Sequence, residues 1–119
     1  MTTEEKLMKL VERLLAKTKA SEIQWEATSI RSDQFQTAFP DYTVKVWSRE
    51  NENDRNATDY VVSVVNEYGT VLESASDVDL SVAFPQRDAL LKMEQLYKLA
   101  RRAALGVDAA LDKLLTDLG

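Results

Sequence analysis

The sequence of 119 residues contains no histidine and no cysteine. The protein therefore has no imidazole base, no thiol nucleophile, no disulfide and none of the metal sites that require a His or Cys ligand. Its three glycines stand alone at positions 69, 106 and 119, which excludes a Gly-rich phosphate loop, a dinucleotide fingerprint and a G-x-S-x-G nucleophile motif. No motif supplies an activating base for a Ser or Thr nucleophile. We expect a protein that is not an enzyme and binds no cofactor and no metal.

Long hydrophobic runs are also missing, because no apolar stretch approaches the roughly 20 residues that cross a bilayer. The first residues, Met1 to Lys6 (MTTEEK), are polar and lack the apolar region of a secretory signal. Hydrophobic residues still make up 45% of the chain, and a chain of this length can bury a core without metal or disulfide support. The sequence thus predicts one cytoplasmic domain over residues 1–119 with no membrane partner.

Charge is distributed unevenly along the chain, whose formal net charge is -5. Residues 1–20 carry 5 basic and 3 acidic groups, residues 21–80 carry 4 and 12, and residues 81–119 carry 6 and 5. The acidic middle segment repels phosphate backbones, so we expect no nucleic acid partner. The same segment supports an alternative function, an acidic immunity-type inhibitor or secretion-chaperone-like protein that binds a basic partner.

The N-terminal residues have the spacing of an amphipathic helix. Apolar side chains recur every three or four residues, at Leu7, Leu10, Val11 and Leu14. Thr2 is followed three residues later by Glu5, which predicts a capping box at the start of this helix.

From Glu22 the period of the apolar residues changes to two, which predicts strands. The predicted strands cover residues 22–28, 35–39, 42–49, 60–65 and 71–75. Turns are expected at Pro40 and at Gly69, and the polar segment 50–58 is expected to be a hairpin loop. Residues 60–65 (YVVSVV) are rich in valine, which is typical of a central strand covered on both faces.

The helical period returns after residue 85, with Leu90, Met93, Leu96 and Ala100 on one face. Pro85 fits at or just before the first turn of this long helix, and Gly106 is expected to end it. Asp108 is expected to cap a short final helix. The apolar stripe that runs on to Leu118 favours a place in the core, and a homodimer interface is the alternative.

These elements predict an α+β fold. An N-terminal helix, an antiparallel meander of four to five strands, a long C-terminal helix and a short final helix would form a two-layer sandwich, with the helices on one face of the sheet.

Two acidic clusters are the candidates for metal-dependent chemistry. Asp77 and Asp79 are expected to be turn and cap residues before the long helix, and their use in a metal-dependent hydrolase is the least favoured function. The segment 51–62 resembles a calcium loop only superficially, because Arg55 occupies its fifth position and Val62 its last.

Six residues are candidates for binding a partner. Lys98, Arg101 and Arg102 form a basic patch at helical spacing on the long helix. Trp47 is out of phase with Val44 and Val46, so it belongs to the face that the helices leave open. The same face is expected to carry Lys45, and Tyr68 is the last candidate.

Four segments resemble a family of small uncharacterised bacterial proteins. The segments are residues 22–26 (EIQWE), 35–39 (FQTAF), 60–69 (YVVSVVNEYG) and 96–108 (LYKLARRAALGVD). The resemblance implies a bacterial, soluble, non-catalytic module and assigns no activity. Together with the spare apolar helix surface, it favours a non-catalytic protein-binding module that forms a homodimer or binds another protein.

Overall fold

A computed structural model describes residues 1–28 and 33–119, and it confirms the α+β class. Five strands form one antiparallel sheet in the order β1-β2-β3-β4-β5, so each strand pairs with its neighbour in the chain. The strands are β1 (Glu26–Ala27), β2 (Gln34–Ala38), β3 (Tyr42–Glu50), β4 (Thr58–Asn66) and β5 (Val71–Ser76). The helices are α1 (Thr3–Lys19), α2 (Asp77–Ala83), α3 (Ala89–Leu105) and α4 (Val107–Leu118).

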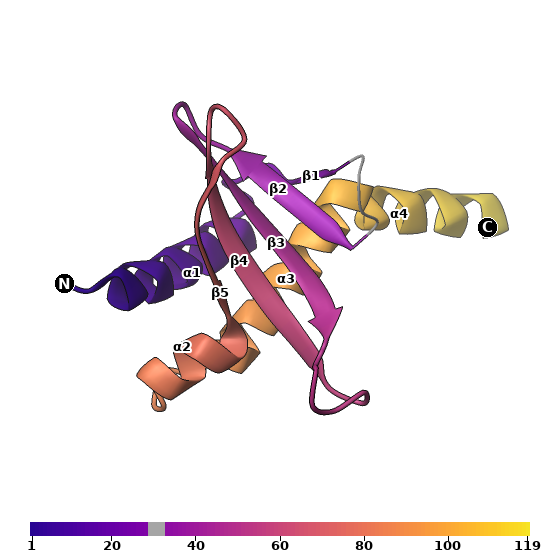
Figure 1. Ribbon diagram of the computed structural model, residues 1–119. Helices are drawn as coiled ribbons and strands as arrows, with labels where there is room; N and C mark the ends of the chain where they lie inside the picture. The colour runs from indigo at the N-terminus through magenta and orange to yellow at the C-terminus, as the bar shows by residue number, and fades with distance from the viewer. Residues whose placement is uncertain (29–32) are drawn as a thin grey trace.

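One face of the sheet is covered by helices and the other is not. On β3, Val44 and Val46 point into the core with Phe35 of β2 and Val62 of β4. Helix α3 crosses this face, and α1 packs against α3 (Figure 1). None of the described helices covers the opposite face. The expected two-layer arrangement is therefore confirmed.

Helix α1 forms where its apolar spacing predicts it. Its buried side chains are Leu7, Met8, Val11, Leu14 and Leu15. The Thr2 hydroxyl accepts a hydrogen bond from the Glu5 backbone N–H at 3.1 Å, which is one half of the expected capping box. The described structure shows no return bond from the Glu5 side chain to Thr2. Trp25 packs in the same core at 6% exposure, and its indole N–H donates to the Thr18 hydroxyl at 3.0 Å.

The structure differs from the sequence expectation at the boundaries of several elements. Residues 77–83 form a helix of their own, α2, because Ser76 and Asp79 make a reciprocal capping box at its start. Strand β1 has only two residues, although the alternating pattern extends over 22–28. The polar residues 29–33 predict a turn after it, and residues 29–32 of this turn lie outside the described range. Helix α4 begins at Val107 directly after Gly106, so Asp108 is not its cap.

Two ion pairs link α1 to the start of α3. The Glu12 carboxylate accepts hydrogen bonds from Arg87 and from Lys92, the latter at 2.6 Å. Arg87 also lies over the ring of Phe84, 5.3 Å from its centroid. Burial by itself raises the pKa of Glu12, but the bonds from Arg87 and Lys92 more than offset it, so the pKa lies below the ordinary glutamate value.

We expect Glu12→Gln to lower the free energy of unfolding at pH 7 by about 0.5–1 kcal/mol, since Glu12 and its two partners are only partly buried. A lowered carboxyl pKa stabilises the fold above the unfolded-state pKa, and this stabilisation is lost as the pH falls through the folded-state value. Urea unfolding at pH 7 and pH 3 measures the difference, which should disappear at the lower pH. An equal difference at both pH values would show that the Glu12 charge is not its cause.

In the part of the chain that the structure describes, no helix is long and apolar enough to cross a membrane.

Candidate functional site

Helix α4 leaves the body of the protein at a sharp break. Gly106 ends α3 with a φ of 64°, a left-handed conformation that glycine adopts at low cost. Its N–H bonds back to carbonyls of α3, and α4 starts at the next residue in a new direction. In Figure 1 the helix projects away from the sheet. None of the residues of α4 is buried.

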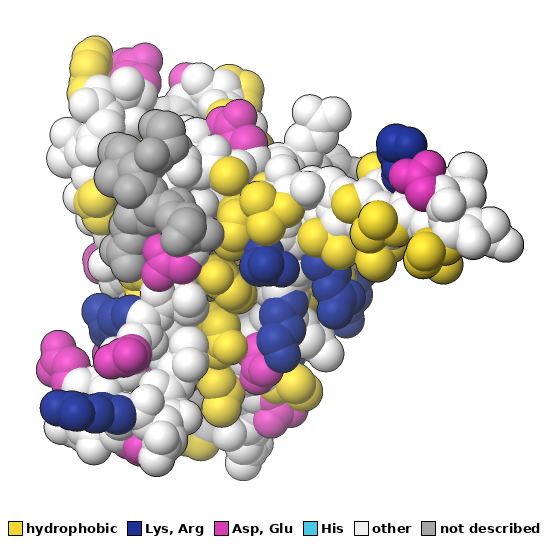
Figure 2. Space-filling view, turned by 90° about the vertical axis from the view of Figure 1, so that its right-hand side faces the viewer, with side chains coloured by type: hydrophobic (Ala, Val, Ile, Leu, Met, Phe, Trp, Pro, Cys, Tyr) yellow, Lys and Arg dark blue, Asp and Glu magenta, His cyan; other side chains and the backbone are white. Residues whose placement is uncertain are grey.

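The apolar side of α4 is a stripe of four leucines at the spacing i, i+3, i+4 and i+7, here called the α4 stripe. It consists of Leu111, Leu114, Leu115 and Leu118. All four are at least half exposed, and Leu118 reaches 83%. Figure 2 shows hydrophobic side chains along one side of the projecting helix. The expectation that this stripe belongs to the core is therefore wrong, because α4 has turned away from the sheet at Gly106.

The outer side of α3 beside this helix is basic. Lys98, Arg101, Arg102 and Leu105 are all exposed and recur at helical spacing, and we call them the α3 patch. Lys98 is paired with Glu94 at 2.7 Å, and this hydrogen bond raises the Lys98 pKa. Neither Arg101 nor Arg102 has an ion-pair partner among the residues that the structure describes. Lys and Arg side chains gather below the root of the projecting helix in Figure 2.

The α4 helix itself carries the opposite charge. Three aspartates, Asp108, Asp112 and Asp117, stand against a single Lys113. Lys113 is already paired with Asp117 at 3.2 Å, so Asp108 and Asp112 carry the net charge of the helix. The α3 patch and α4 thus form an elbow that has a basic arm and an acidic, leucine-rich arm.

The open face of the sheet carries Lys45 and Trp47, as the alternation predicts. Lys45 pairs with Ser63 and Trp47 with Val61 on β4. Both side chains are half-buried, and the smaller Val61, Ser63 and Val65 between the strands are almost fully covered. Within the described structure the Ser63 hydroxyl has no hydrogen-bond partner. Since Ser63 is only 1% exposed, no substrate reaches its hydroxyl and it is not an available nucleophile.

The six candidate partner-binding residues therefore lie at three separate places. Lys98, Arg101 and Arg102 share the outer side of α3, Lys45 and Trp47 share the open sheet face, and Tyr68 lies at the turn between β4 and β5 with 84% exposure. Of these three places, the α3 patch is the one that leads through Gly106 directly into α4 and its stripe.

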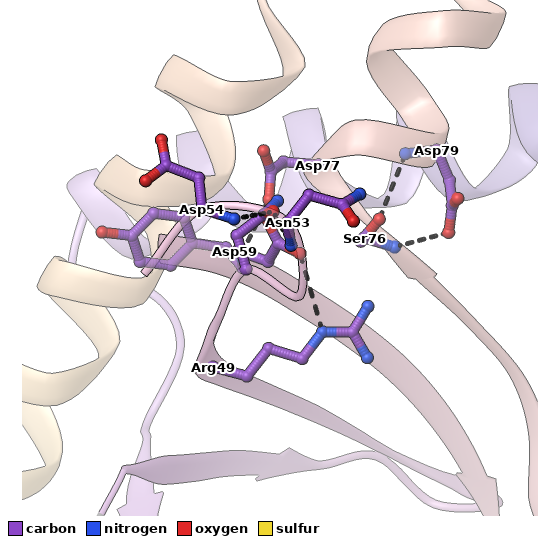
Figure 3. Close-up of polar contacts among 9 residues, drawn as sticks. Arg49, Asn53, Asp54, Asp59, Ser76, Asp77 and Asp79 are labelled. Atoms are coloured by element: carbon purple, nitrogen blue, oxygen red, sulfur yellow. Dashed lines mark hydrogen bonds and ion pairs between the residues drawn. The ribbon is translucent and has the colours of Figure 1, made fainter. Parts of the chain in front are cut away.

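The acidic clusters have structural roles at the other end of the sheet (Figure 3). Asp59 accepts a hydrogen bond from the Asn51 side chain at 2.9 Å and lies 3.8 Å from the Arg49 guanidinium. The buried Asp77 accepts the Tyr60 backbone N–H at 2.7 Å. Burial raises the pKa of Asp77, and the Asp59 charge raises it further against the effect of the Tyr60 bond.

The acidic side chains of the strand connections are divided between the two ends of the sheet. The turns after β2 and β4, with Asp41 and Glu67, lie at one end of the meander, and the segment 50–57 lies at the other. In the segment 51–56 the side-chain oxygen of Asn51 accepts hydrogen bonds from the backbone N–H groups of Asn53 and Asp54. Among the described residues, no three potential carboxylate ligands are arranged to hold a metal ion.

Comparisons with protein-family models, with curated proteins and with solved structures found no match to this chain. The resemblance to small bacterial proteins remains a prediction.

Proposed function

We propose that this is a non-catalytic, cytoplasmic protein-binding module, and that it binds through the α4 stripe. The observation that carries the proposal is that four leucines at helical spacing remain exposed on a helix with no buried residue. Fully burying a leucine side chain contributes about 1.5–3 kcal/mol. A protein surface that covers the stripe would gain a large part of this free energy for each of the four side chains.

The stability of α4 as a helix supports the same conclusion. It has 12 residues, and isolated helices of fewer than about 12–15 residues are marginal in water. Most helices in proteins are stabilised by packing an amphipathic face, which α4 does not do within its own chain. Its one i,i+4 ion pair, Lys113 with Asp117, contributes only about 0.3–0.5 kcal/mol. A covering partner would supply the missing packing.

A photo-crosslinking residue at position 114 tests the proposal in the cells that produce the protein. We expect covalent adducts with a protein, which can be a second copy, after irradiation. The matched control is the same residue at Val82, which is 78% exposed on α2 and lies away from the stripe. Mass spectrometry identifies the adducts. Equal adduct yields at positions 114 and 82, or none at either, would contradict the proposal.

A further inference from the structure

The two arms of the elbow have complementary chemistry. The α3 patch presents Arg101 and Arg102 without ion-pair partners among the described residues, beside the exposed Leu105. The α4 helix presents Asp108 and Asp112 beside the leucine stripe. Within one chain Arg102 and Asp108 line the same hollow beside Gly106, but the described part of the structure shows no ion pair between the two arms. The charges of both arms can therefore be paired by oppositely charged groups on another molecule.

The size of α4 indicates what kind of partner covers it. A helix of 12 residues is about 18 Å long and about 10 Å across, so one docked α4 covers far less than the about 800 Å² that each partner buries in a standard interface. Two helices docked reciprocally, each against the elbow of the other molecule, bring the buried surface nearer to that size. A partner with the same elbow can receive one such helix and return another.

We propose that the occupant of the α4 stripe is a second copy of this chain. In this two-fold dimer, which deepens the proposed function and depends on it, the leucine stripes pack on each other. The Asp108 and Asp112 carboxylates of each copy then face Arg101 and Arg102 of the other. A two-fold interface of this kind is self-complementary, so every contact occurs twice.

A different receiving surface exists beside α1, and the charges disfavour it. A hollow of about 380 Å³ has an apolar floor that includes Leu10, Leu14 and Phe39, with Arg13 and Lys17 on its rim. Its rim also includes Glu22, which is paired with Lys17 at 2.8 Å and leaves less free positive charge for an acidic helix. The α3 patch has two arginines available, so it is the better receiver for α4.

Sedimentation velocity on the full chain tests the dimer with two charge-reversal variants. Arg101→Glu/Arg102→Glu places acidic groups against the Asp108 and Asp112 of the other copy, and Asp108→Lys/Asp112→Lys places lysines against its arginines. We expect the wild-type protein to be a dimer and each variant alone to have a dissociation constant at least about tenfold higher. An equimolar mixture of the two variants should form a heterodimer, because both sets of charges are then opposite again.

The matched control is Lys6→Glu/Arg55→Glu, which reverses two exposed basic residues away from the elbow and should leave the dimer unchanged. Circular dichroism establishes that each variant is folded. A wild-type protein that stays monomeric up to about 1 mM would overturn the dimer. So would a dimer that survives both reversals, fails to re-form in the mixture, or dissociates with Arg13→Glu/Lys17→Glu instead. Adducts from position 114 with a different protein would keep the proposed function while the dimer fails.

Discussion

Leu96→Ala should lower the free energy of unfolding by about 2–5 kcal/mol, whereas Leu115→Ala should change it by less than about 0.5 kcal/mol. The two leucines belong to successive helices, but Leu96 is 1% exposed and Leu115 is 68% exposed. Removing the Leu96 side chain leaves a cavity between α3 and the sheet. Removing the Leu115 side chain takes away surface that water already contacts.

The measurement is urea unfolding at low protein concentration, where mass action keeps self-association from contributing. Sedimentation velocity at high concentration measures dimer formation instead. Here Leu115→Ala should have the larger effect, because it removes part of the α4 stripe and Leu96→Ala leaves the stripe intact. Leu114→Ala should behave as Leu115→Ala does, since both side chains lie on the stripe. If Leu115→Ala destabilised the dilute protein as much as Leu96→Ala, α4 would be packed on its own chain.

The sheet could be predicted from the sequence because its signals are local. Alternation over 42–49 places Val44 and Val46 opposite Lys45 and Trp47, and the structure shows this arrangement. Pro40 and Gly69 mark two turns, and the valines of β4 indicate a strand covered on both faces. Each of these signals depends on neighbouring residues and not on the position of a distant element.

The position of the helices depended on information that the local pattern does not contain. The leucines of α4 have the same spacing whether the helix lies on the sheet or projects from it, and the direction set by Gly106 decides between the two. The apolar spacing also predicts Leu90 in the core, but Leu90 is 48% exposed, because α3 buries the side defined by Met93, Leu96 and Ala100. The sequence therefore predicts the leucine stripe but not that the stripe is exposed to solvent.

The candidate site could likewise be predicted only in part, because the sequence gives the residues of each helix but not how the helices are placed. The basic spacing of Lys98, Arg101 and Arg102 identified one arm of the elbow from the sequence. The acidic arm does not follow from the sequence, because Asp108 there predicts a helix cap and Asp112 lies in an apolar segment whose spacing favours the core. Charges on two helices form one surface only when the bend between the helices is known.

Asp77→Ala should lower the free energy of unfolding by about 1–3 kcal/mol, whereas Asp77→Asn should raise it at pH 7. The Asp77 carboxylate accepts the Tyr60 N–H at the point where β5 has ended and offers no further backbone partner. Alanine leaves that buried N–H without an acceptor. Asparagine keeps an acceptor oxygen and removes the charge that burial and Asp59 make unfavourable.

The pH dependence separates the charge of Asp77 from its hydrogen bond. A carboxyl group whose pKa is raised by folding contributes stability that is fully present below the unfolded-state pKa and is lost as the pH rises through the folded-state value. Asp77→Asn does not titrate, so its advantage over the wild-type protein should be present at pH 7 and should disappear as the pH falls below about 4. Urea unfolding of the three proteins from pH 3 to pH 7 measures this. An advantage that stays constant over this range would mean that the Asp77 charge costs nothing in the folded protein, and the carboxylate pair would then stabilise the end of the sheet instead of straining it.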